Sequence, residues 1–192
     1  KGDYPIVGQH TFLNVTATSQ TVFDFRQVPT ATTPFESTRG FDQREFFGQP
    51  EQTTLLQNIF VRLDLFHGNQ TGFKPLDWQF RITPVVNMNS NHVDELALLN
   101  PDVRTGRTRF RDHFILQEYF AEVKLADISP DYDFASLRVG SQFFNSDFRG
   151  FIFFDTNRGA RLFGSRLSNR HQFNVIFFDM QEKETNSQLN TF

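Results

Sequence analysis

The chain has 192 residues and a formal net charge of −3, so it can form one large domain or two small ones and lacks the basic excess typical of nucleic-acid binding. It contains no cysteine, which excludes a disulfide scaffold, a thiol nucleophile and a cysteine-ligated zinc site. Phenylalanine, which favours strands, is abundant, with 26 residues against 3 tyrosines and 1 tryptophan.

The first half of the chain predicts strands joined by loops. The N-terminus lacks an apolar signal-peptide core, so we expect that the mature chain begins here or that its ends have been trimmed. Residues 11–28, rich in Thr, Val and Phe, predict one long strand or a hairpin, and residues 29–52 predict a long loop. From about residue 54 to 66, and again from 76 to 83, apolar and polar residues alternate strictly, as in strands with two unlike faces. Pro84 limits the second of these strands to an edge, an end or a bulge.

The second half continues the pattern. Residues 92–103 are the one helix-like stretch, with a disordered loop as the alternative. Residues 114–125 predict a strand with Ile115 and Tyr119 on its apolar side, and residues 134–144 predict the next one. The total of eight or nine strands has no sustained helical period, and no run approaches the roughly 18 apolar residues of a spanning helix, so the fold class is all-β. Three short strands, separated by the turn-forming sequences DTNRG and SNR, complete the chain: residues 147–155, 160–167 and 171–180.

The alternating strands leave open which face meets water. In a soluble sandwich the apolar face forms the core, and Arg62 and Asp64 point outward. In an outer-membrane barrel the apolar face meets lipid, and the same two residues point into an aqueous lumen. Strands of ten or more residues, and connections that alternate between long polar loops and short turns, favour the barrel.

Four segments of the second half also resemble, in their order along the chain, outer-membrane porins of the alginate-export type from Gram-negative bacteria. Together they cover about seventy residues. Ser141 stands where the family has a second arginine, and NSDFRG replaces the family's GDGR hairpin. The segments are LQEYFAEVK (116–124), LRVGSQ (137–142), DFRGFIFFDTNRGARLFG (147–164) and SNRHQFNVIFFD (168–179).

The resemblance implies an antiparallel transmembrane β-barrel of roughly twice this strand number, closed around an arginine-rich pore in the outer membrane of a Gram-negative bacterium. Residues 1–192 would then form a single β-barrel domain or a barrel segment of a longer chain. If the chain is complete, about eight strands would make a narrow barrel filled by its own side chains, which suits an anchor or adhesin better than a channel.

We expect the lumen to be lined by polar and charged side chains from the face opposite the apolar one. Arginines there would attract anionic solutes, as charged rings do in pores. The alternative is that each arginine pairs with an acidic neighbour and only fills the lumen. The predicted pore-lining residues are Arg62, Asp64, Arg81, Glu118, Glu122, Arg138, Gln142 and Arg161.

The sequence does not predict an enzyme. Glu118 and Glu122 would lie about 13 Å apart along a strand, beyond the carboxylate spacing of glycosidases. The five histidines have no metal-ligand spacing, and no nucleophile elbow is present, so we expect no catalytic residue, no metal site and no cofactor. Asp102, Asp131 and Asp133 indicate solvated turn acids, with a surface calcium site as the alternative.

These patterns predict a porin-like outer-membrane protein that passes polar or anionic solutes such as oligosaccharides. Its expected partners are the lipid bilayer and those solutes, not nucleic acid, and the pattern allows a homo-oligomer or a larger outer-membrane assembly. Trp78 and Tyr119 would belong to an interfacial aromatic girdle, with ordinary core packing as the alternative. A soluble or surface-attached β-sandwich that binds carbohydrate or self-assembles is the second hypothesis, and a structural barrel without conductance is the third.

Overall fold

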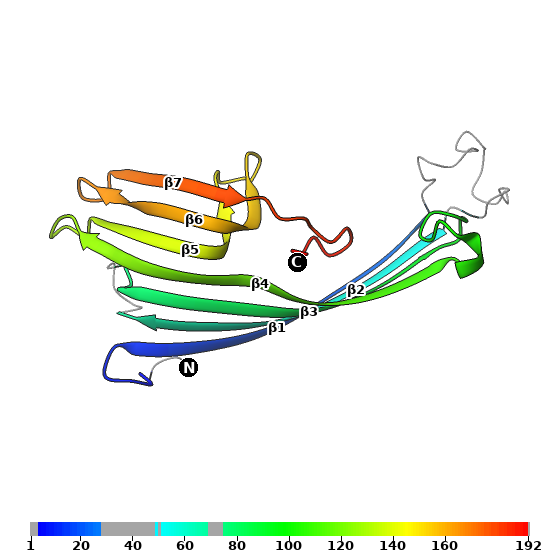
Figure 1. Cartoon of the computed structure of the whole chain (residues 1–192), viewed down its shortest axis with the longest axis horizontal. Helices are drawn as coiled ribbons and strands as arrows, with labels where there is room; N and C mark the ends of the chain where they lie inside the picture. Colours follow the sequence, from blue (N-terminus) through cyan, green and yellow to red (C-terminus); the bar gives the residue numbers. More distant parts are fainter. Residues whose placement is uncertain (1–3, 28–48, 50, 69–74, 192) are drawn as a thin grey trace. The chain divides into compact units, whose positions relative to one another are not determined.

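The computed structural model describes residues 4–27, 49, 51–68 and 75–191. Its strands form one antiparallel sheet in which each strand lies beside its neighbours in the sequence, in the order β1 to β7 (Figure 1). The all-β, antiparallel prediction is therefore confirmed. The elements are β1 (Thr11–Gln27), β2 (Glu51–His67), β3 (Trp78–Val93), the 3-10 helix η1 (Val103–Thr105), β4 (Thr108–Asp127), β5 (Phe134–Asn145), β6 (Phe154–Arg166) and β7 (His171–Asp179).

The connections at the two ends of the strands differ in length. Because consecutive strands are antiparallel, connections one, three and five share one end, and connections two, four and six share the other. Each connection of the first group is longer than the one that follows it, as the sequence predicted. The first group is residues 28–50, 94–107 and 146–153, and the second is residues 68–77, 128–133 and 167–170.

Seven strands are present in the described part of the chain, rather than the eight or nine expected. The sequence DTNRG was expected as a turn but lies inside β6. Its Gly159 is needed for close packing rather than for a turn, because a Cβ atom there would lie 2.0 Å from the carbonyl oxygen of Phe177 on β7. Two expected short strands therefore merge into one, and β1 is a single strand instead of a hairpin.

The expected helix at residues 92–103 is also wrong. Strand β3 continues to Val93, and the only helical turn that follows within residues 94–191 is η1, where Asp102 accepts a hydrogen bond from the backbone N–H of Arg104. A stretch this short forms a stable helix only if it buries an apolar face, and η1 has no buried residue.

Pro84 neither ends β3 nor lies on an edge strand, so two of its three expected positions are wrong. The strand runs through it, between β2 and β4. Pro84 has no N–H to donate to a neighbouring strand. It lies next to Val85, where the contacts of the chain divide into two compact units: unit 1 comprises residues 1–18, 60–85 and 115–192, and unit 2 comprises residues 19–59 and 86–114.

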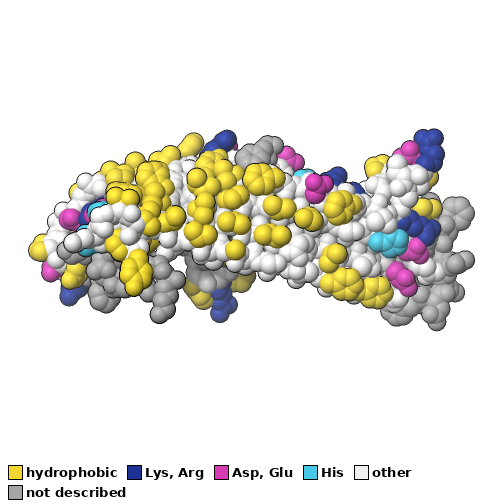
Figure 2. Space-filling view, turned by 90° about the horizontal axis from the view of Figure 1, so that it is seen from below, with side chains coloured by type: hydrophobic (Ala, Val, Ile, Leu, Met, Phe, Trp, Pro, Cys, Tyr) yellow, Lys and Arg dark blue, Asp and Glu magenta, His cyan; other side chains and the backbone are white. Residues whose placement is uncertain are grey.

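In unit 1 many hydrophobic side chains are exposed and many polar ones are buried, which is the reverse of the usual arrangement in a soluble sheet. Among the described residues the buried hydrophobic side chains are few, and buried polar and charged ones outnumber them. Exposed hydrophobic side chains instead gather over the sheet (Figure 2). The buried hydrophobic residues are Phe66, Val85, Ile115, Phe120 and Leu189.

The exposed side chains form continuous rows across four strands of unit 1. We call this surface the apolar face. Val139 on this face is 50% exposed, although its cross-strand neighbours Ala121 and Ala160 are apolar too. Since all seven strands belong to one sheet, no second sheet in the described residues packs on these rows. The rows across β4, β5, β6 and β7 are Val123–Leu137–Leu162–Val175 and Ala121–Val139–Ala160–Phe177.

In unit 2, side-chain amides form a buried row along β3. Asn91 donates to Asn89, Asn89 to Asn87 and Asn87 to Asn58 on β2, with N···O distances of 3.4, 3.0 and 2.6 Å. The hydroxyl of Thr54 donates to Asn91 at 3.0 Å. Burial of these amides is tolerated because each finds a partner in the row.

Candidate functional site

The eight predicted pore-lining residues all lie in unit 1, on the face of the sheet opposite the apolar face. We call this surface the polar face. Strand alternation places them there, since Arg138 is flanked on β5 by the apolar-face residues Leu137 and Val139. Seven of the eight form two clusters on neighbouring strands, and Gln142 lies apart from both.

The first cluster lies across β2, β3 and β4 and is balanced in charge. Arg81 donates to Asp64 at 2.6 Å and lies 3.7 Å from Glu118. Arg62 donates to Glu118 at 3.2 Å, and the hydroxyl of Thr83 donates to the same carboxylate at 3.1 Å. The two arginines are therefore paired with the two carboxylates. This is the arrangement expected if Arg62 and Arg81 only fill the lumen.

The second cluster lies across β4, β5 and β6 and is not balanced. Glu122, Arg138 and Arg161 are direct cross-strand neighbours. Arg138 donates to Glu122 from Nε at 2.7 Å, and its guanidinium lies 4.3 Å from the ring centre of Phe120. Arg161 lies 4.4 Å from the ring centre of Phe163.

Arg161 differs from the other three arginines in its partners. Its Nε donates to the neutral Oδ1 of Asn174 at 2.7 Å, and it forms no ion pair with any residue that the structure describes. Arg161 and Arg138 are directly opposite one another, and such like-charged pairs repel. The cluster therefore carries one cation more than it has carboxylates.

Gln142 lies on the polar face but is fully buried rather than facing solvent. Neither of its side-chain polar atoms has a hydrogen-bond partner among the described residues. Its cross-strand neighbour is Asn157 on β6, whose amide donates to Asp155. Sequence reasoning did not single out Asn174 or Phe163, and the only signal for them was alternation with Arg161 across β6 and β7.

Aromatic side chains lie at both ends of the strands on the apolar face. Trp78 and Phe80, with ring centres 5.5 Å apart, lie at the start of β3, next to a short connection. Phe143 and Phe154, with ring centres 4.9 Å apart, lie beside the longer connection between β5 and β6. Tyr119 lies in the middle of β4, opposite Ser141. Of the two residues expected in an aromatic girdle, Trp78 therefore lies at a strand end and Tyr119 does not.

Two short turns meet at one end of unit 1. Asp133, in the turn before β5, is only 3% exposed, so its interpretation as a solvated acid is wrong. Its carboxylate accepts hydrogen bonds from the backbone N–H groups of Ser168 at 3.0 Å and Asn169 at 2.9 Å, and from the hydroxyl of Ser129 at 2.8 Å. These bonds favour the ionised form and lower the pKa of Asp133.

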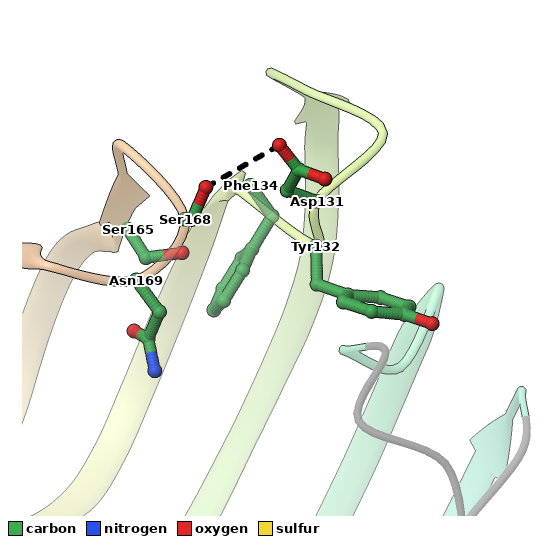
Figure 3. A pocket seen from close by; sticks show the side chains of 6 residues that line it. All are labelled: Asp131, Tyr132, Phe134, Ser165, Ser168 and Asn169. Carbon is green, nitrogen blue, oxygen red and sulfur yellow. Dashed lines mark hydrogen bonds between the residues drawn. The ribbon is translucent and has the colours of Figure 1, made fainter.

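A pocket of about 420 Å³ opens between these two turns. In Figure 3 Ser168 of one turn faces Asp131 of the other, to which it donates at 3.3 Å, and the ring of Tyr132 points away from them. The pocket is lined by six residues of these turns and of the strand ends beside them. They are Asp131, Tyr132, Phe134, Ser165, Ser168 and Asn169.

Asp133→Asn is expected to lower the stability of this end of unit 1. The folded-state pKa of Asp133 is below its unfolded value, so its contribution is complete above about pH 4 and is lost as the pH falls through the folded-state pKa. The variant should be less stable to urea at neutral pH and should lose less stability on acidification. Asp131→Asn, with one side-chain contact to the same turn, is the matched control. Equal effects of the two substitutions would contradict this assignment.

None of the family models, curated proteins and solved structures compared with this chain matches it. No helix in the described ranges is long and apolar enough to cross a membrane. Over the same ranges, no three histidine, aspartate or glutamate side chains come together as metal ligands would.

Proposed function

We propose that the chain forms part of an outer-membrane β-barrel of a Gram-negative bacterium, through which polar or anionic solutes pass. The observation that carries the proposal is the reversed polarity of unit 1. Rows of Val, Leu, Ala and Phe cross four strands on one face, with the ion pair Arg158–Asp179 in the next row, while the pairs Arg81–Asp64 and Arg138–Glu122 lie on the opposite face. In water this arrangement is costly, because a large exposed apolar patch needs a cover. In a bilayer the acyl chains supply that cover, and the polar face lines a lumen.

The strand lengths support the same proposal. A strand inclined by about 40° crosses an apolar band about 25 Å tall with roughly ten residues. Strands β1 to β6 have between 12 and 20 residues, and β7 has 9. Soluble proteins average strands of about 5–6 residues. The longer connections at one end and the shorter ones at the other also match outer-membrane barrels.

The charge balance of the polar face favours anions among the solutes. Three of its four predicted arginines pair with carboxylates, and these pairs orient the side chains more than they attract solutes. Arg161 has a neutral partner and lies against a phenylalanine ring. It is therefore the residue at which a carboxylated or otherwise anionic sugar would be drawn to the lumen wall.

Arg161→Glu tests both the lumen and its selectivity. In planar-bilayer recordings of the full-length protein, the anion-to-cation permeability ratio is expected to fall by about threefold or more, because the charge at this point changes by two units. Arg161→Gln should give an intermediate ratio. Arg104→Glu is the matched control, since Arg104 is an exposed arginine in the connection before β4.

Three outcomes separate the hypotheses. A full-length protein that stays monodisperse without detergent would overturn the barrel and favour the sandwich. A protein that inserts but carries no current would overturn passage and favour a structural barrel. Equal permeability ratios in the wild type and the Arg161→Glu variant would leave a conducting barrel whose selectivity arises elsewhere.

A further inference from the structure

The chain that follows β7 does not leave the sheet but folds over the polar face. Figure 1 shows this segment, in red, turning back on itself after β7. Residues Lys183 and Asn190 pair as an isolated antiparallel bridge, and the backbone N–H of Thr191 donates to the carbonyl of Glu182 at 2.9 Å. We call residues 181–191 the inward segment. It has a fold of its own, a small hairpin rather than an extended tail.

The tip of this hairpin is fixed by one carboxylate. Glu184 is 4% exposed, and its Oε2 accepts hydrogen bonds from the backbone N–H groups of Asn186 at 2.9 Å and Ser187 at 2.6 Å. The hydroxyl of Ser187 donates to the same oxygen at 2.8 Å. A turn closed in this way holds its shape, so the inward segment behaves as one body.

On one side the segment is attached to β6 by Lys183. The lysine Nζ lies 2.8 Å from Asp155 and donates to the carbonyl of Thr156 at 2.6 Å and to the side chain of Asn190. The backbone N–H of Gln181 donates to Asn157 at 2.9 Å. Asp155 and Asn157 alternate with Arg161 on β6, so these contacts are on the polar face.

On the other side the segment reaches β3 and β4. Leu189 is 6% exposed and packs against Val85 and Ile115, with Phe60 at the margin. Val85 alternates with Arg81 on β3 and therefore lies on the polar face. Sequence alternation had placed Ile115 on the apolar face, which is wrong: the buried side of β4 changes parity between Ile115 and Glu118, and Ile115 packs with Leu189. The segment thus crosses the polar face from β6 to β3.

From these contacts we propose that the inward segment is a constriction: it narrows the lumen and sets the size of solute that passes. This inference rests on the proposed function, because the polar face is a lumen wall only in a barrel. Strand β7 ends where the longer connections lie, so the segment occupies the position of a long loop that folds inward instead of outward. Lys183 makes the ion pair that holds the segment on β6, beside the hydrogen bond from the backbone N–H of Gln181 to Asn157.

Residues 1–192 contain no cysteine, so cysteines introduced among them give a direct test of the attachment. In full-length protein in lipid vesicles, Leu189→Cys is expected to react with a water-soluble maleimide at least about tenfold more slowly than Leu167→Cys, because Leu189 is buried and Leu167 is in an exposed turn. Adding Lys183→Met should remove most of this protection. Adding Lys183→Arg, which keeps the charge near Asp155, should retain it. Equal rates for the two cysteines with Lys183 intact would overturn the placement of the segment.

Conductance tests the constriction itself. Lys183→Met is expected to raise single-channel conductance by about twofold or more, and to let larger neutral sugars into liposomes, because flow follows the open cross-section. Lys124→Met is the matched control, since Lys124 carries the same charge but pairs with Asp77 and Asp127, away from the segment.

The outcomes separate the two proposals. Suppose that Leu189→Cys reacts freely in the Lys183→Met background, so that the segment is released. Equal conductance of wild type and Lys183→Met would then overturn the constriction and leave the porin function standing. Current in Lys183→Met alone would support both proposals. The absence of current from every protein would overturn the proposed function and the constriction with it, whereas the maleimide rates would still report whether the segment is held.

Discussion

Val139→Arg is expected to lower the free energy of unfolding in a lipid bilayer by about 2–4 kcal/mol, the cost of arginine on the lipid side of a barrel near the bilayer midplane. Val139 belongs to the apolar face, between Ala121 and Ala160, and it is half exposed. A half-exposed valine on the surface of a soluble sheet would accept arginine within about 0.5 kcal/mol. The two environments therefore predict effects that differ by several-fold at one position.

Val103→Arg provides the matched control. Val103 is 51% exposed, almost the same as Val139, but it lies in η1, in a connection between strands. Its substitution is expected to change stability by less than about 0.5 kcal/mol. Urea unfolding of the full-length protein from vesicles, followed by heat-modifiable gel migration, measures both. If the two variants are equally stable, the apolar face does not meet lipid.

Glu122→Gln is expected to destabilise the protein by about 3 kcal/mol, because it leaves a largely buried arginine without its counter-charge. Arg138 is the residue left unpaired, and it directly faces Arg161, which has no carboxylate partner within the described residues. The same variant should raise the preference for anions in planar-bilayer recordings, since the lumen wall gains net positive charge.

The double variant Glu122→Gln/Arg138→Gln separates charge from shape. If the loss in the single variant arises from an unpaired cation, removal of that cation should restore most of the stability. A single-variant effect below about 1 kcal/mol, as found for exposed ion pairs, would contradict the burial of this cluster. It would indicate a wide lumen in which water already screens Arg138 and Glu122.

The strand periodicity predicted the two faces of the sheet wherever a strand kept its two-residue repeat. It placed Arg62, Asp64 and Arg81 on one side before any contact was known, and the structure joins them through Glu118. It could not tell which arginine lacks a carboxylate, because that depends on which residues of neighbouring strands are opposite one another. Only the register of β5 with β6 brings Arg161 next to Arg138.

The predictions that were wrong concern residues whose surroundings come from distant parts of the chain. Gly159 was interpreted as a turn former, yet it serves the close approach of β7. Ile115 is not on the apolar face because the alternation of β4 breaks before Glu118, and it packs with Leu189 instead; Asp133 is buried because a turn more than thirty residues later donates to it. None of these partners is adjacent in the sequence, so local pattern and propensity carry no signal for them.

The amide row of unit 2 has a direction, since every member donates the same way, from Thr54 through Asn91, Asn89 and Asn87 to Asn58. An aspartate has the outline of asparagine but offers only acceptors. At an interior position of the row it would place oxygen against oxygen and leave a charge buried. Aspartate is therefore not tolerated at Asn87, Asn89 or Asn91. Replacing a single amide NH2 group by an oxygen would interrupt the whole row of hydrogen bonds.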